Sequence, residues 1–189
     1  MHLNAKFSRL AQSQSAPLWF LLLTILGLCL TIVGAVPISV PEEEYNIDEW
    51  NHFTAVERLT TVLQTSLSQG QLPTTDELIN FGGIEATRGS VYYWLQAAIQ
   101  LLLPAAMGQW PRLIVARLVS VLLLLSTVTL THAASLRLFP NQKRVALLAA
   151  VLIGLTPTML MIGVGVNLEI AGLWLGTFVL FLLADLQRY

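Results

Sequence analysis

Long apolar runs alternate with short polar segments along this chain of 189 residues. Four runs carry almost no charge, and each is close to the roughly 20 residues that a helix needs to span about 30 Å of hydrocarbon. They cover residues 17–36, 118–136, 145–166 and 170–186, of which the last is slightly short. Ser, Thr and Gly inside these runs suit close helix–helix contact in lipid. The pattern therefore predicts four membrane-spanning helices.

Residues 91–107 form a further apolar stretch whose pattern allows two interpretations. Its length is at the lower limit for crossing a bilayer, which is about 17 residues. Tyr92, Gln96 and Gln100 recur every four residues and would form one polar stripe on a helix, which Pro104 then interrupts. Such a helix either lies in the interface or beside a wet cavity, or it crosses the membrane with its glutamines facing neighbouring helices.

The basic residues favour the surface position for residues 91–107. Short loops rich in Lys and Arg prefer the cytoplasm. Arg137, Lys143 and Arg144 occupy one short loop, whereas residues 166–169 carry no Lys or Arg. With a cytoplasmic N-terminus, four crossings put six Lys and Arg inside and four outside, and five crossings reverse these numbers. We therefore expect four crossings, with residues 91–107 returning along the outer surface.

Composition and charge agree with a membrane protein. The chain is 55% hydrophobic and 11% charged, whereas soluble domains carry about 25% charged residues. Nine of its eleven acids lie between Glu42 and Glu85, and its basic residues form no stripe for nucleic acid. We expect the first apolar run to be an uncleaved anchor, because no small-x-small cleavage site follows it. The single cysteine, Cys29, can form no internal disulfide.

The predicted fold class is an all-α membrane protein with about four transmembrane helices, five being the alternative, and with amphipathic juxtamembrane helices in a large outer loop. The plasma or inner membrane is the expected location, with the N-terminus cytoplasmic. The predicted layout is a cytoplasmic N-terminus (1–16), a transmembrane helix (17–38), an extracytoplasmic loop (39–117) with amphipathic helices at about 48–69 and 91–107, and three transmembrane helices (118–189).

The outer loop begins with an acidic cluster that could carry chemistry. Asn46 and Glu49 have the spacing of a helix capping pair, so Asp48 and Glu49 are expected in the first turn of the helix, with His52 one turn on. Three interpretations remain open. The carboxylates form a solvated helix start, favoured by the helix dipole. Together with His52 they ligate a cation. Alternatively, one of them is a general base at the membrane surface.

Three further predictions concern residues outside this cluster. Residues 71–90 should be an irregular loop, because Pro73 and several glycines break regular structure there. His132 should form hydrogen bonds between helices near the cytoplasmic end of its span. Asp185 should lie with Arg188 at the cytoplasmic interface.

Five short motifs, taken in order, resemble the N-terminal part of the GT-C membrane glycosyltransferases, a group that includes the protein O-mannosyltransferases and the aminoarabinose transferases that act on lipid A. The resemblance covers nearly all of the chain, and it rests on the ordered set more than on any one motif. The motifs are Asp48-Glu49-Trp50-Asn51-His52-Phe53, Val91-Tyr92-Tyr93-Trp94-Leu95, Ala116-Arg117-Leu118-Val119-Ser120, Arg137-Leu138-Phe139-Pro140 with the basic residues after it, and Asn167-Leu168-Glu169.

The resemblance implies sugar transfer from a polyprenyl-phosphate donor to an acceptor on the outer face. It implies that Asp48 is the general base and that Glu49 assists it. Glu49 and His52 would orient the acceptor or bind the phosphate region through a divalent cation. His52 would thus bind substrate, together with Glu169 and Asn167 from the second outer turn. The expected partners are the lipid bilayer, the lipid-linked donor and a partner chain that supplies further helices, because family members usually continue for several hundred more residues. The alternative function is that of a non-catalytic multi-pass subunit.

Overall fold

The computed structural model describes residues 2–35, 47–80, 91–104 and 106–187. Asn46, Arg188 and three of the predicted loop glycines, Gly82, Gly83 and Gly89, lie outside the described residues, and so do the side chains of residues 2–15, Ala35, Ile47, Asp48, Ile79 and Asn80. Within the described residues the chain forms helices and no strands. The helices are α1 (His2–Ala35), α2 (Ile47–Gln69), α3 (Thr75–Asn80), α4 (Val91–Leu101), α5 (Gln109–Leu138), α6 (Lys143–Leu155), α7 (Pro157–Val164) and α8 (Leu168–Leu186).

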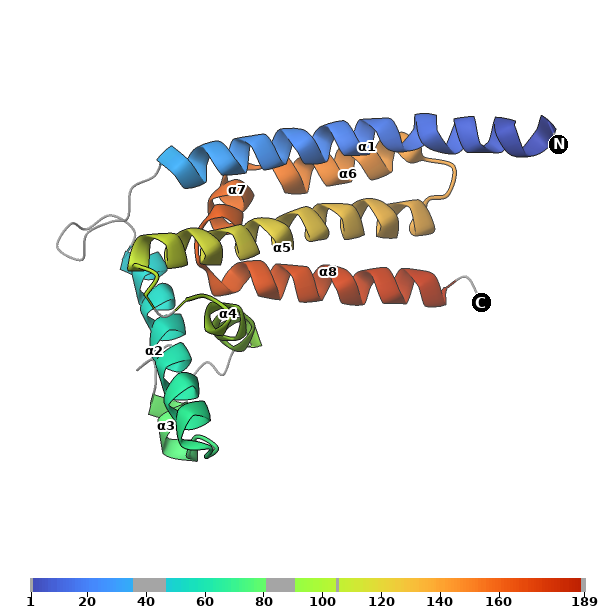
Figure 1. Cartoon of the computed structure of the whole chain (residues 1–189). Helices are drawn as coiled ribbons and strands as arrows, with labels where there is room; N and C mark the ends of the chain where they lie inside the picture. The colour runs from blue at the N-terminus through green and yellow to red at the C-terminus, as the bar shows by residue number, and fades with distance from the viewer. Residues whose placement is uncertain (1, 36–46, 81–90, 105, 188–189) are drawn as a thin grey trace.

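Five of these helices form an elongated bundle, in which α1, α5, α6 and α8 run side by side (Figure 1). Three described segments are long and apolar enough to cross a membrane, namely Ala16–Gly34 of α1, all of α5 and all of α8. The bent pair α6 and α7 supplies a fourth if it counts as one span. The prediction of an all-α protein with about four membrane-spanning segments is therefore confirmed.

The third predicted span is broken into two helices. The axes of α6 and α7 differ by 60°. Thr156 has extended backbone angles at the break, and Pro157 begins α7 at a position where its missing N–H costs no helical hydrogen bond. The hydroxyl of Thr156 donates to the carbonyl of Leu152 and so satisfies one acceptor at the end of α6. The proline thus redirects the chain toward the end of the bundle where α8 starts.

Helix α5 is the centre of the bundle and contacts α1, α6, α7 and α8. Two glycines let neighbouring helices approach it closely. A Cβ on Gly163 would lie 2.5 Å from Cδ2 of Leu124, and one on Gly154 would collide with Ile25 and Val128. Small residues at helix contacts are the usual means of close packing in lipid, where the hydrophobic effect does not drive helices together.

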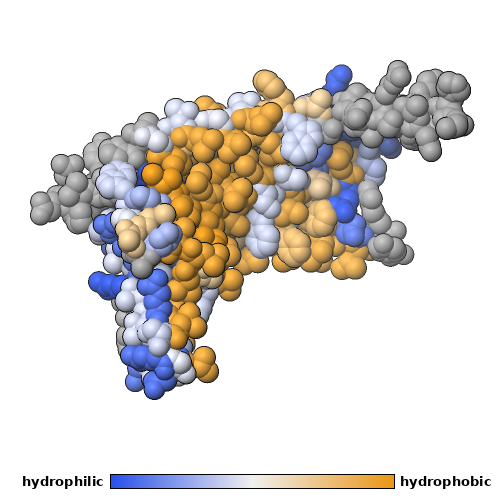
Figure 2. All heavy atoms as spheres, in the orientation of Figure 1, coloured by the Kyte–Doolittle hydropathy of each residue, from blue (hydrophilic) through white to orange (hydrophobic). Residues whose placement is uncertain are grey.

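Helices α2, α3 and α4 form an arm at one end of the bundle, which we call the arm end; the other end is the loop end, where α5 turns into α6. Helix α2 starts at the arm end and runs away from the bundle, crosswise to its long helices, and α4 packs against it (Figure 1). Figure 2 shows a broad hydrophobic surface over the bundle and hydrophilic residues along one side of the arm. Leu67 and Leu72 are 70% and 91% exposed, so apolar side chains of the arm are available to a membrane interface.

The predicted helix at 48–69 corresponds to α2, which ends where the sequence indicates. Gly70 has a φ of 64°, a conformation that glycine adopts without strain. Its N–H donates to the carbonyl of Leu67, and the N–H of Gln71 donates to that of Ser66. This pair of bonds is a Schellman motif, which satisfies the last carbonyls of the helix.

Two details of the arm differ from the prediction. Helix α4 ends at Leu101, not at residue 107, because the chain leaves the helix before Pro104. Its 11 residues are far too few to cross the roughly 30 Å of a hydrocarbon layer.

The segment expected to be irregular contains α3, which begins with a capping box. The N–H and hydroxyl of Thr74 donate to the carboxylate of Glu77, and the N–H of Glu77 donates to the Thr74 hydroxyl. The bond from the Thr74 backbone lowers the pKa of Glu77.

Candidate functional site

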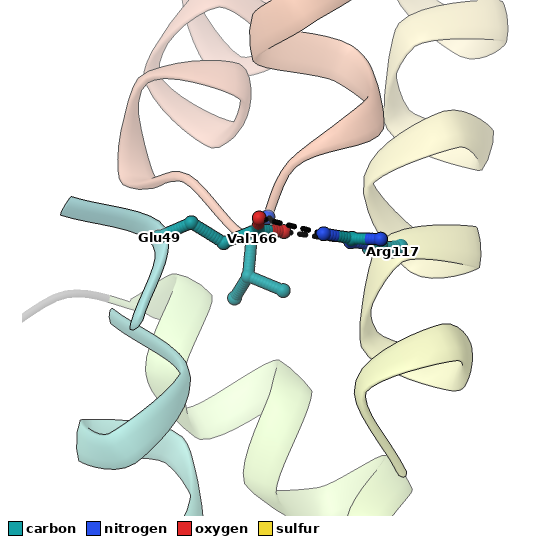
Figure 3. Close-up of polar contacts among 3 residues, drawn as sticks. All are labelled: Glu49, Arg117 and Val166. Atoms are coloured by element: carbon teal, nitrogen blue, oxygen red, sulfur yellow. Dashed lines mark hydrogen bonds and ion pairs between the residues drawn. The ribbon is translucent and has the colours of Figure 1, made fainter. Parts of the chain in front are cut away.

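A buried ion pair joins the arm to the bundle (Figure 3). Arg117 of α5 donates from Nε to Oε1 of Glu49 and from Nη2 to Oε2, at 2.8 Å each. The N–H of Val166 donates to the same Oε1 at 3.0 Å. Glu49 is 8% exposed and Arg117 is 2% exposed. Two parallel bonds of this kind are the strongest arrangement that an Arg–carboxylate pair can adopt.

The ion pair connects three segments that lie far apart in the sequence. Glu49 is in the first turn of α2, Arg117 lies two turns inside α5, and Val166 belongs to the turn between α7 and α8. Burial removes water from both charges, so each charge depends on the other for its stabilisation. The carboxylate of Glu49 is therefore committed to holding α2 against the bundle, and it is oriented toward Arg117.

His52 lies one turn further along α2 and is also buried, with 2% exposure. Its Nδ1 forms a short hydrogen bond with the hydroxyl of Tyr93, which is itself inaccessible to solvent. The two rings lie 5.8 Å apart, centroid to centroid. This pair fixes α2 to α4, just as the ion pair fixes α2 to α5.

The polar stripe on α4 faces α5. Its side chains form hydrogen bonds with groups on α5 that are also four residues apart and come in the reverse order. The hydroxyls of Tyr92 and Ser120 are 3.0 Å apart, Gln96 donates to the carbonyl of Ala116 at 3.0 Å, and Gln100 donates to the carbonyl of Arg112 at 2.9 Å. Burial raises the pKa of Tyr92 to about 12, so its hydroxyl stays protonated. The glutamines thus face a neighbouring helix, although α4 does not itself span the membrane.

The structure places the remaining predicted residues at the arm end. Asp48 lies in the first turn of α2, although its side chain lies outside the described part. Asn167 caps α8, its Oδ1 accepting from the N–H of Glu169 at 2.8 Å. Glu169 is exposed. Because Glu49 bonds to Val166, the residue before Asn167, the start of α2 and the 166–169 turn lie against each other.

Beside this turn lies a cavity of about 600 Å³ between α4, α5 and α8, which we call the arm-end groove. Tyr92 and Glu169 are its polar members. Trp174 closes part of one wall, since its indole N–H donates to the hydroxyl of Ser126 on α5 at 2.8 Å. Most of the lining is apolar and comes from Val91, Leu95, Leu123, Leu168, Ala171, Gly172 and Leu175.

The described residues hold no group of three or more His, Cys, Asp or Glu side chains placed to ligate a metal ion. Glu49 uses both carboxylate oxygens in bonds to Arg117 and Val166, and His52 uses Nδ1 in its bond to Tyr93. These two side chains therefore connect α2 to α5, to the turn before α8 and to α4.

The sequence patterns did not indicate Arg117 or Tyr93 as site residues, although both lie in motifs that resemble those of the GT-C enzymes. A signal was present for Arg117, because it is a charged residue at the start of a long apolar run, where a charge needs a partner. At the loop end, Asp185 pairs with Arg137 at 2.7 Å, whereas Arg188, its expected neighbour, lies outside the described residues.

The fold and the site together define an all-α, multi-pass membrane protein whose arm is held to the bundle by a buried ion pair. Comparisons of the chain with protein-family models, curated proteins and solved structures found no match. The resemblance to the GT-C glycosyltransferases therefore rests on the motifs in the sequence alone.

Proposed function

We propose that this chain is a GT-C-like glycosyltransferase module, which transfers a sugar from a polyprenyl-phosphate donor to an acceptor at the arm end. The observation that carries the proposal is the arm-end groove. A polyprenyl chain is a long hydrocarbon that needs an apolar channel, and its phosphate and sugar need a polar site at the end of that channel. The groove has a volume of about 600 Å³ and a mostly apolar lining that includes Glu169. The start of α2 contacts the turn beside it, because Glu49 accepts a hydrogen bond from Val166.

In this proposal Asp48 accepts the proton of the acceptor hydroxyl. The hydroxyl oxygen then attacks the anomeric carbon of the sugar, the bond between that carbon and the phosphate oxygen breaks, and polyprenyl phosphate leaves with the bonding electrons. Glu49 holds α2 in place through Arg117 and so positions Asp48, the preceding residue. Glu169, exposed at the groove, faces the polar part of the substrate.

A second candidate is a non-catalytic membrane subunit, and a specific observation favours it. Glu49 and His52, two residues expected to act on substrate, are buried and bonded to Arg117, Val166 and Tyr93. In that role the arm is a rigid surface for a partner chain, and changing Asp48 has no effect on any reaction.

Filling the groove tests the proposed donor site. A Cβ on Gly172 meets no atom within 4 Å, so Gly172→Phe can extend into the groove without disturbing the backbone. We expect this variant, in nanodiscs, to reduce labelling by a photoreactive polyprenyl phosphate about tenfold, a loss of about 1.4 kcal/mol in binding.

Gly176→Phe is the matched control for this experiment. Gly176 lies one turn further along α8, its added Cβ also meets nothing within 4 Å, and it does not line the groove. This variant should keep wild-type labelling. Equal labelling of the wild type and of both variants would place the lipid elsewhere and remove the support that the groove gives to the donor proposal.

A further inference from the structure

A second cavity, of about 260 Å³, lies at the loop end of the bundle between α1, α5 and α6. It is separate from the proposed donor site, because the two cavities share no lining residue. The candidate function of the arm end makes no use of it. Its three polar lining side chains are His132, Lys143 and Arg144, all of them basic residue types.

The charges of this cavity are not neutralised within the described part of the chain. Lys143 and Arg144 begin α6 and are exposed, and none of the described acidic residues lines the cavity. Asp185, the acid of this end of the bundle, is bound to Arg137 at 2.7 Å. The positive end of the α6 dipole adds to the charge of the two side chains. The cavity is therefore built to attract an anion.

The remainder of the lining is apolar and comes from α1, α5 and α6: Pro17, Leu18, Leu136 and Leu147. A soluble anion needs no such lining. A molecule with an anionic head and a hydrocarbon tail matches both parts of the cavity, with its phosphate at Lys143 and Arg144 and its tail against the leucines.

The position of the cavity across the membrane also matches that of a lipid headgroup. The membrane-spanning part of α1 begins at Ala16, next to Pro17, and the spans α5 and α8 end at Leu138 and Leu186. Lys143 and Arg144 therefore lie where hydrocarbon gives way to headgroups. His132 is six residues before Leu138, which places it about 9 Å deeper along α5, on the acyl-chain side of Lys143 and Arg144.

We propose that this cavity is a binding site for an anionic phospholipid of the leaflet at the loop end. Lys143 and Arg144 bind the lipid phosphate, the imidazole of His132 donates a hydrogen bond to an ester oxygen of the deeper-lying acyl chain, and one acyl chain lies against Leu18, Leu136 and Leu147. Basic pockets between transmembrane helices are established sites for such headgroups. The bound lipid bridges α1, α5 and α6.

Native mass spectrometry of the purified chain tests this site. The protein is exposed to phosphatidylglycerol and to phosphatidylcholine with identical acyl chains, and separately to glycerol 3-phosphate, the soluble source of the same phosphate. We expect phosphatidylglycerol to be retained preferentially, and glycerol 3-phosphate at millimolar concentration not to displace it. Displacement by glycerol 3-phosphate, or equal retention of the two lipids, would overturn the lipid assignment.

Two variants locate the binding. Lys143→Gln combined with Arg144→Gln should lower retention of phosphatidylglycerol about thirtyfold, given about fivefold for each basic residue near a membrane surface. Leu18→Trp fills the cavity without changing its charge and should lower the retention of phosphatidylglycerol as well. Arg58→Gln removes an exposed charge from the arm and serves as the control.

The pattern among these variants decides the proposal. A loss in the double variant and in Leu18→Trp, with Arg58→Gln unchanged, supports the site. An equal loss in Arg58→Gln means that retention follows net charge, and no loss in either cavity variant means that the lipid binds elsewhere; either result refutes the proposal. If the double variant does not fold, the proposal is still tested by Leu18→Trp and by the comparison of the two lipids on the wild type.

Discussion

Replacing Arg117 with methionine should lower the free energy of unfolding by about 3–5 kcal/mol, the usual cost of removing one partner of a buried ion pair. The reason is that Glu49, 8% exposed, would stay in a poorly hydrated place without its cation. The side chain of methionine is similar in length, so the loss reports charge more than packing. Unfolding in mixed micelles of mild detergent and dodecyl sulfate, followed by circular dichroism, measures the change.

Two further variants make this measurement specific to the pair. Arg112→Met, on the same helix, removes a half-buried guanidinium that bonds only to the carbonyls of Met107 and Pro104 among described residues. This change should cost less than about 1 kcal/mol, because no carboxylate loses its partner. Glu49→Leu combined with Arg117→Met removes both charges and should recover part of the loss. If the free energy of unfolding of Arg117→Met lies within about 1 kcal/mol of the wild-type value, the ion pair does not hold the arm to the bundle.

Asp48→Asn should reduce sugar transfer by a factor of about 10²–10⁴, the usual contribution of a general base. An amide cannot accept the proton of the acceptor hydroxyl, yet it has nearly the same size, so expression and folding should be unchanged. The assay uses membranes that contain the chain, incubated with radiolabelled hexosyl and pentosyl polyprenyl phosphates, and it measures the label moved to acceptor.

Asp76→Asn is the matched control for Asp48→Asn. Asp76 is an exposed acid of α3 in the same arm, so its replacement changes net charge equally and should leave transfer intact. If Asp48→Asn keeps the wild-type turnover, Asp48 is not the base. If neither the wild type nor the variants transfer any sugar while the groove still binds polyprenyl phosphate, the non-catalytic subunit becomes the better description.

The membrane-spanning helices could be predicted from the sequence because their signal is local. Residues 118–136 contain no Asp, Glu, Lys or Arg and many leucines and valines, and they form the later part of α5. The observed helix is longer, with 30 residues and therefore about 45 Å, since it continues beyond the hydrocarbon layer at its arm end. Apolar length indicates where a helix lies in lipid, and it says little about where that helix begins.

The arm was harder to predict because its signals compete. Around α3, Pro73 and the later glycines indicated a loop, whereas the capping box formed by Thr74 and Glu77 was the stronger local signal. The four-residue repeat of Tyr92, Gln96 and Gln100 correctly indicated one face of a helix. It could not indicate that this face would form hydrogen bonds with three groups on α5.

The connection at the candidate site could not be predicted from spacing. Glu49 and Arg117 are 68 residues apart, and Glu49 and Val166 are 117 apart. Local spacing suggested a capping role for Glu49, beside Asn46 and one turn before His52. Asn46 lies outside the described residues, so the capping role stays a prediction. Spacing could not indicate that the fold brings Arg117 to the carboxylate, where it gives the charge at the start of the apolar run a partner of opposite sign.

The proposed site requires the start of α5 and the 166–169 turn to lie on the outer side of the membrane, opposite the α5–α6 loop. Measuring the side on which each of these segments lies is therefore the most direct test. Single cysteines at Trp110, Pro140 and Asn167, in a Cys29→Ala background, can be labelled on intact cells with an impermeant maleimide. We predict labelling at positions 110 and 167 without permeabilisation, and at position 140 only after it. Labelling of 167 together with 140, and not with 110, would contradict the account.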